Sequence, residues 1–285
     1  MNDKRFVRMA GLCLIVALMV GTAAVIGVFF RGEGTPTTIV SPRGEEYAMI
    51  SAGVYRYNSQ RMVSEGAGWD IFTLFFAVPA MLAVLFGLSR GVLRARLFAL
   101  GLLVYFFYQY LCYALGWAFG PLFPLFIVIF AASLAGALWI ASTVDVAGLP
   151  AQLSKRFPRR GMAILCAFMA VVLLAMWGQR IAAGLHGDLA TAMLLGQTTM
   201  VVQVLDLGLL VPLSLFTALA AWRGWPVGYL LSSVFVVKAV AMAAAICAML
   251  LSAWATEGTL EVAPLLIFGT AAAAASWLGV RMYRR

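Results

Sequence analysis

Charged side chains are scarce in this sequence. Only 11% of the 285 residues are Asp, Glu, Lys or Arg, whereas 64% are hydrophobic, and the mean hydropathy is +0.98. An average soluble domain carries about 25% charged residues. The shortage of charge therefore excludes an ordinary soluble domain and predicts a protein embedded in a membrane.

Histidine and cysteine are also scarce. His186 is the only histidine, and the four cysteines lie in apolar segments without a Cys-x-x-Cys pair. This argues against a haem held by two histidines, a histidine-ligated zinc, a His-based hydrolytic triad and a quinone-linked thiol oxidoreductase. Walker, G-x-S-x-G and H-E-x-x-H motifs are absent as well, which argues against ATP-driven transport by this chain alone and against the common hydrolases. We expect no cofactor, no metal site and no enzymatic activity.

Long apolar runs are what the sequence has in abundance. Each is about as long as the roughly 20 residues that a helix needs to cross a bilayer, and each is continuous rather than alternating, which argues against a β-barrel. The first run follows Lys4, Arg5 and Arg8 and is longer than the apolar core of a typical signal peptide, so we favour an uncleaved signal anchor. The sequence predicts an all-α membrane protein, one polytopic domain over 1–285, with eight spans: 7–30, 71–89, 97–117, 121–141, 161–183, 200–221, 226–252 and 262–281.

The net charge of +9 follows the predicted topology. With the N-terminus inside, fourteen Lys and Arg residues fall on the inner side and five on the outer side. This bias predicts that both termini are cytoplasmic. The basic charge is then explained by orientation, and nucleic acid is not expected as a partner.

Two loops are long enough to form structure of their own. The predicted outer loop, 31–69, contains TTIVSPRGEEYAMI, in which two extended runs flank a Ser41-Pro42-Arg43-Gly44 turn. This pattern indicates a small β-hairpin. The basic cytoplasmic loop, 142–160, indicates a short surface helix with its apolar residues facing lipid and Lys155 and Arg156 facing headgroups.

The second and sixth spans share a spacing. Each contains a proline followed eleven residues later by Arg-Gly, at Pro79 and Arg90 and again at Pro212 and Arg223. Both copies run in the same direction, which favours a parallel 4+4 repeat with halves 1–141 and 161–285. Chance similarity between Leu-rich hairpins is the competing explanation.

Two charged residues lie within the sixth and seventh spans. Asp206 comes before the turn at Arg223 and Lys238 after it, at nearly equal heights by helical rise. A charge near the bilayer centre costs about 2.5 to 3.5 kcal/mol, so the two charges must pair with each other or face a hydrated cavity, and their equal heights lead us to expect that they meet. The pair is either a proton or cation site or a structural bridge.

The third span carries a polar stripe. Tyr105, Gln109, Cys112 and Gly116 share one helical face, which we expect to face the bundle or a cavity. Interhelical hydrogen bonding and a solute path both explain this stripe. Asp70, at the predicted outer edge of the second span, either caps that helix or lies at the outer mouth of the site.

Several segments have a familiar form: GVYRYNS, GWD, VLDLGLLVPLSL and GYLLSSVFVVKA. Together they resemble a family of uncharacterised bacterial polytopic membrane proteins, over most of the chain after the first span. The resemblance implies the same multi-span fold in a bacterial inner membrane. It brings no activity, ligand or catalytic residue.

The polar residues within the spans favour a transporter or channel-like protein for a small solute or ion. Asp206, Lys238, Gln109 and Tyr105 are the candidate intramembrane site, with Asp70 near its outer mouth. The rival interpretation is a non-transporting sensor or the membrane subunit of a larger complex. A lipid-modifying enzyme ranks third. The expected partners are the bilayer and a small solute, an ion or a partner membrane protein.

Overall fold

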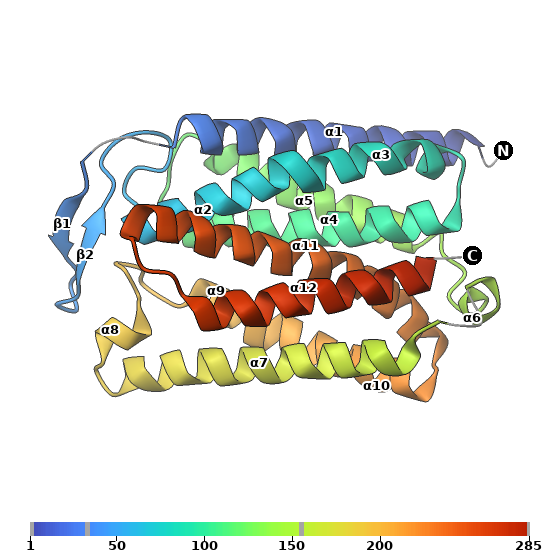
Figure 1. The fold of residues 1–285 in the computed structure, drawn as a ribbon. Helices are drawn as coiled ribbons and strands as arrows, with labels where there is room; N and C mark the ends of the chain where they lie inside the picture. The colour runs from blue at the N-terminus through green and yellow to red at the C-terminus, as the bar shows by residue number, and fades with distance from the viewer. Residues whose placement is uncertain (1–2, 32–34, 154–156, 284–285) are drawn as a thin grey trace.

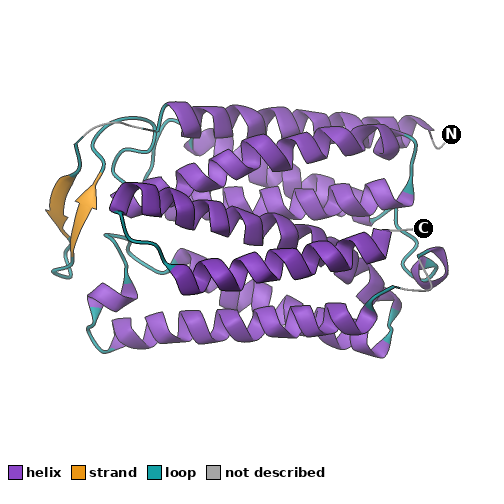
Figure 2. Cartoon of the chain, in the orientation of Figure 1, coloured by secondary structure: helices purple, strands orange, loops and turns teal. Residues whose placement is uncertain are grey.

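The structure is a computed structural model that describes residues 3–31, 35–153 and 157–283. In this part of the chain, eight helices are long and apolar enough to cross a membrane, and they form one bundle (Figures 1 and 2). Six of them are continuous: α1 (Asp3–Phe29), α4 (Leu93–Gly116), α5 (Phe123–Ala141), α7 (Arg159–Leu185), α11 (Pro226–Glu257) and α12 (Val262–Tyr283).

The second and sixth spans each contain a π-helical turn. The second consists of α2 (Gln60–Phe72), η1 (Thr73–Ala77) and α3 (Val78–Ser89), and the sixth of α9 (Val201–Leu205), η2 (Asp206–Leu210) and α10 (Val211–Arg223). A proline follows each π turn by two residues, at Pro79 and Pro212. Proline has no N–H and clashes with the carbonyl four residues earlier. The wider π turn accommodates that conflict inside a continuous span.

The helices pack as two sets of four with the same neighbours. In the first set α1 contacts α3 and α5, and α4 contacts α3 and α5. In the second set α7 contacts α10 and α12, and α11 contacts α10 and α12. The two sets are joined chiefly where α11 packs against α2 and α4. Both chain ends lie at one end of the bundle (Figure 1).

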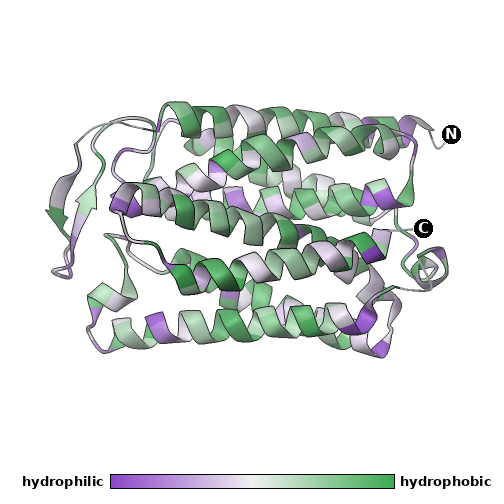
Figure 3. Ribbon diagram, in the orientation of Figure 1, coloured by the Kyte–Doolittle hydropathy of each residue, from purple (hydrophilic) through white to green (hydrophobic). Residues whose placement is uncertain are grey.

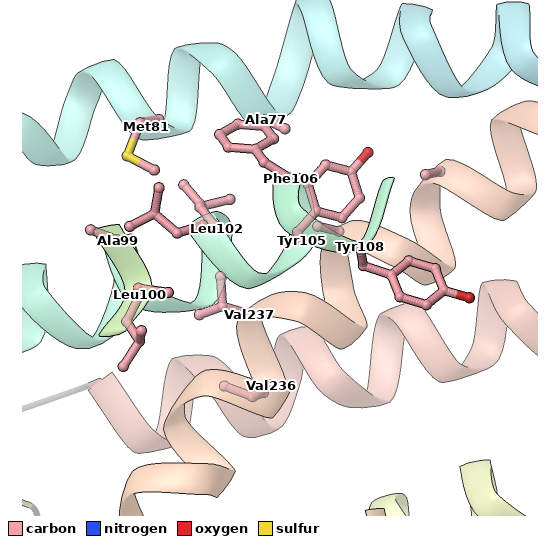
Figure 4. Close-up of a cluster of buried hydrophobic side chains, with 14 of the residues drawn as sticks. Ala77, Met81, Ala99, Leu100, Leu102, Tyr105, Phe106, Tyr108, Val236 and Val237 are labelled. Carbon is pink, nitrogen blue, oxygen red and sulfur yellow. The ribbon is translucent and has the colours of Figure 1, made fainter. Parts of the chain in front are cut away.

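Helix α4 is the centre of the bundle. In its most apolar stretch 72% of the residues are buried, against 22–39% in the other seven spans. Its residues Leu102 and Phe106 pack near Met81 of α3 and Val237 of α11 (Figure 4). The surrounding helices present large apolar side chains outward, as with Phe86 and Leu138, and hydrophobic residues predominate along the spans (Figure 3). Such a surface is suited to contact with lipid.

Two short strands lie at the end opposite the termini (Figure 1), which we call the hairpin end. β1 (Thr37–Val40) pairs antiparallel with β2 (Glu46–Met49), and the connecting turn contains Gly44 at φ +86°. That φ lies in the left-handed region that glycine adopts at little cost. The hairpin is tied to the segment before the sixth span, because Arg43 donates to the carbonyls of Gln197 and Thr198 at 3.2 and 3.0 Å.

Two sequence predictions about the loops need correction. Helix α2 begins at Gln60, capped by Ser59, whose side chain accepts from the amide of Met62, so the end of the 31–69 segment is helical. The short α6 (Leu149–Gln152) follows α5, and its Leu149 is buried in the core rather than facing lipid. Lys155 and Arg156, expected at the headgroups, lie outside the described residues. The remaining short helix, α8 (Leu189–Ala192), follows α7 at the hairpin end.

Candidate functional site

A cavity of about 580 Å³ lies between the two sets of helices. Residues from α2, α4, α7, η2, α11 and α12 line it. At the hairpin end it begins beside Arg61 and Glu261, and its deep part reaches Asp206, Ser214 and Lys238. Pockets of roughly 300–1,000 Å³ are the usual size for a small organic ligand.

Asp206 is held by two neutral donors. It is the first residue of the π turn η2, and its side chain accepts a hydrogen bond from the hydroxyl of Tyr108 on α4. Its other carboxylate oxygen, Oδ2, accepts from Nε1 of Trp177 on α7 at 2.8 Å. Hydrogen bonds to an ionised group are stronger than those between neutral groups, so these contacts fix the carboxylate in place.

Lys238 contacts the same tyrosine from the other side. Its Nζ lies 4.3 Å from the centre of the Tyr108 ring, the geometry of a cation–π interaction. The expected direct contact between the two charges is absent, because all ion pairs with N–O distances up to 4.0 Å among the described residues centre on Arg61. Tyr108 contacts the acid through its hydroxyl and the base through its ring.

The other two candidate residues belong to a different network. The indole of Trp69 donates to the Tyr105 hydroxyl at 3.1 Å, and that hydroxyl and Thr73 share a hydrogen bond of 2.8 Å. Thr73 in turn donates to Oε1 of Gln109 at 2.9 Å. Tyr105 and Gln109 are completely buried and do not line the cavity. Figure 4 shows Tyr105 and Tyr108 leaving α4 in different directions.

Of the predicted stripe on α4, Cys112 and Gly116 line the cavity, whereas Tyr105 and Gln109 do not. Tyr108 and Cys112 are four residues apart, and both line the cavity with Asp206 and Lys238. The same i, i+4 spacing that selected Tyr105 and Gln109 also relates this pair. No feature of the local sequence distinguishes the helical face of Tyr108 from that of Tyr105. Cys112, a polar residue of the predicted stripe four residues after Tyr108, was the one usable signal.

Asp70 is buried within α2 and is not a helix cap. The cap lies at Ser59, and Asp70 does not line the cavity. Its Oδ2 accepts from the Tyr55 hydroxyl at 2.7 Å and its Oδ1 from the Tyr113 hydroxyl at 3.1 Å. Burial, together with the nearby carboxylate, raises the pKa of Tyr55 well above its ordinary value. Tyr55 is thus a permanent donor that ties the connection between α1 and α2 to the bundle.

Replacing Tyr55 with phenylalanine tests this attachment. The change removes one of two donors to a buried carboxylate, so we expect a loss of about 1–3 kcal/mol in the free energy of unfolding. Thermal unfolding of the purified protein in detergent measures it. Tyr57→Phe is the matched control, since Tyr57 is 55% exposed and should be neutral. Equal melting temperatures for wild type and Tyr55→Phe would contradict the attachment.

A cluster of charges lies at the hairpin end of the cavity. Arg61 on α2 pairs with Glu65 at 2.6 Å and with Glu257 of α11 at 2.8 Å, and it also pairs with Glu261 just before α12. One guanidinium therefore joins three spans at the hairpin end. Such partly exposed pairs contribute modestly one by one and more as a network.

The described residues contain no candidate metal site, and the chain matches no known protein. Within the described ranges, no group of three or more His, Cys, Asp or Glu side chains is placed to hold a metal ion. No protein-family model, curated protein or solved structure matches the chain.

Proposed function

We propose that this chain is a transporter or channel-like protein of a bacterial inner membrane that passes a small solute or ion. The observation that carries the proposal is the cavity, which runs from Arg61 and Glu261 at the hairpin end to Asp206 and Lys238 within the bundle. Charged residues inside a membrane protein normally face a hydrated path or a ligand. A passive bundle has no need for such a space beside two intramembrane charges.

The distribution of arginine supports an orientation for this path. The spans carry Arg90, Arg94, Arg223 and Arg281 at or near the ends that lie with the chain termini. Positive residues favour the cytoplasmic side. In the proposed orientation the termini are cytoplasmic, the hairpin end is outside, and the cavity is entered from outside.

The two sets of helices support a parallel 4+4 repeat. One offset of 133 residues relates Pro79 to Pro212 and Arg90 to Arg223. Both copies have the π turn before the proline, and both have a glycine of positive φ after the arginine.

The same offset relates Thr73 to Asp206 and Tyr105 to Lys238. In the first copy, Thr73 and Tyr105 share a hydrogen bond in the closed core. In the second copy, the charged pair lines the cavity. In this proposal, one half is the structural copy and the other holds the solute.

Cys112 is a native reporter of the proposed path. It lines the cavity, whereas Cys166 is completely buried and does not. In a variant that retains only Cys112, we expect a charged, membrane-impermeant thiol reagent added on the hairpin side to label the protein. The rate should exceed that of a variant that retains only Cys166 by at least about tenfold, since thiol chemistry requires access to the sulfur.

Flux through the labelled protein completes this test. Proteoliposomes containing the Cys112-only variant are given gradients of small neutral solutes, amino acids and salts, and the reagent should reduce the flux of the transported one. Reduction of the mixed disulfide should restore it. Labelling of Cys112 no faster than Cys166, or no solute flux above protein-free vesicles, would overturn the proposed path.

One observation favours the non-transporting alternative. The hairpin is bound to residues that also line the cavity, because Glu45 accepts from the amide of Leu195 at 3.0 Å. A partner that binds the hairpin outside the membrane would thereby contact the wall of the cavity. A sensor of this kind would show labelling of Cys112 without solute flux.

A further inference from the structure

Lys238 has hydrogen-bonding capacity that the protein leaves unused. The side chain is 94% buried and lines the cavity, and no hydrogen-bond acceptor for its Nζ is present among the described residues. The Tyr108 ring occupies one side of the ammonium group. An ammonium group has three donors, and Nζ of Lys238 is not one of the fully enclosed polar atoms that lack a partner, so it borders the cavity. The donors of Lys238 are therefore open to an acceptor inside the cavity.

Asp206, unlike Lys238, already forms hydrogen bonds with the protein. Each of its carboxylate oxygens already accepts a hydrogen bond, one from Tyr108 and one from Trp177. Among the described residues it forms no ion pair with Lys238 within 4.0 Å, so it does not act as the acceptor for the lysine's donors. One acid and one base leave the deep part of the cavity without net charge. In a medium of low dielectric constant, an uncharged ligand enters such a site at lower cost than an ion.

The rest of the cavity is apolar and adaptable. Methionines from α2, α7 and α11 line it, together with Trp69, Phe235 and Phe268. Met169 and Met176 of α7 pack against the cluster of Phe268 and Ala271 on α12, so these flexible side chains lie where α7 meets α12. Methionine adapts to ligands of varied shape. This wall suits a hydrocarbon chain that comes from the bilayer.

We propose that the cavity binds an uncharged amphiphile whose carbonyl oxygen accepts a hydrogen bond from Lys238 while its apolar tail lies among the methionines. A lipid-soluble quinone has this chemistry: a polar ring with carbonyl acceptors, no charge, and a hydrocarbon tail. The inference rests on the site of the proposed function and names the class of molecule that the site takes.

Binding is tested with decyl-benzoquinone and the full-length protein in detergent. Trp69, Trp117 and Trp177 line the cavity, so a bound quinone should quench tryptophan fluorescence with saturation. We expect Lys238→Met to weaken binding by at least about tenfold, because it removes a charge-assisted donor. Lys238→Arg should stay within a few-fold of wild type. Met176→Trp should also weaken binding, because it fills the apolar part of the cavity.

The comparison probe is decanoate, which has a similar tail and a charged head. Tighter binding of decanoate than of the quinone would overturn the inference in favour of an anionic ligand. Quenching that does not saturate, or that is equal in wild type and Lys238→Met, would also overturn it. Size-exclusion elution and a cooperative melting transition in the absence of the probe verify that the Lys238→Met variant is folded.

The experiments distinguish a failure of the proposed solute path from a failure of the proposed ligand class. If Cys112 is accessible and solute flux occurs but the quinone does not bind, the solute path is retained and this ligand class is wrong. If the quinone binds with the expected dependence on Lys238 but Cys112 is inaccessible to the charged reagent, the ligand class is retained and the hydrated path is wrong.

Discussion

Gly68→Val is expected to destabilise the helix bundle strongly. Gly68 lies on α2 against the backbone of α11, and a Cβ atom added there would lie 2.7 Å from the Cα of Met249 and still closer to the carbonyl of Ala248. Because these are backbone atoms of a packed helix, a change of side-chain rotamer cannot relieve the clash. Overpacking of a well-packed core costs about 1–3 kcal/mol and occasionally more, and we expect the upper end here because two backbones must separate.

The matched control is Gly178→Val on α7. Its added Cβ would meet nothing within 4 Å, while the loss of a glycine and the gain of a β-branched residue in a helix are the same. Size-exclusion profiles and melting temperatures in detergent should show aggregation or a large loss for Gly68→Val and a nearly wild-type protein for Gly178→Val. Similar losses in both variants would mean that helix propensity or membrane insertion is responsible, and not the close approach.

This contact also determines the shape of the cavity. Helix α11 is the helix through which the second set packs against the first, on α2 and α4. Glu65 and Trp69 on α2 line the cavity beside Met249 and Leu250 of α11. The small residue at Gly68 is thus what allows the two walls to approach at the hairpin end while the space below remains open.

The fold was largely predictable because its main signal is local. A run of about 20 apolar residues is sufficient to predict a span, and all eight predicted runs fall within the eight helices or end within a few residues of them. The start of α2 at Gln60 was missed, because its first turns are amphipathic and Ser59 is an ordinary cap signal in a polar segment. The π turns at Thr73 and Asp206 were missed because they arise from a conflict between proline and the preceding turn.

The candidate site was predictable along the membrane normal but not around the helix axes. Helical rise placed Asp206 and Lys238 at similar heights, and both line one cavity. Their rotation depends on the packing of α4 between the two halves, which no local pattern specifies. For that reason the direct ion pair was wrong, and Tyr108, which connects the two charges, was overlooked in favour of Tyr105 and Gln109.

Asp206→Asn is expected to destabilise the protein far more than Lys238→Met. An asparagine has the shape of the aspartate but replaces one acceptor oxygen with an amide NH₂ group, which donates. The amide keeps its oxygen toward the indole N–H of Trp177 only if its NH₂ group faces the Tyr108 hydroxyl, which must then accept a hydrogen bond and loses the carboxylate as the partner of its own O–H. We expect a loss of about 2–4 kcal/mol in the free energy of unfolding, because one buried charge-assisted hydrogen bond is lost and its donor is left unpaired.

Lys238→Met should cost no more than about 1 kcal/mol. Methionine keeps the unbranched shape and places a sulfur near the Tyr108 ring, a favourable contact, while Asp206 retains both of its donors. In the double variant we expect a stability within about 1 kcal/mol of Asp206→Asn alone. Denaturation at neutral pH in one detergent measures all four proteins as a double-mutant cycle. Equal losses for the two single variants, with most of the loss recovered in the double variant, would instead indicate a direct structural ion pair. The arrangement around Tyr108 would then be wrong, and the unused donors of Lys238 would no longer point to a ligand.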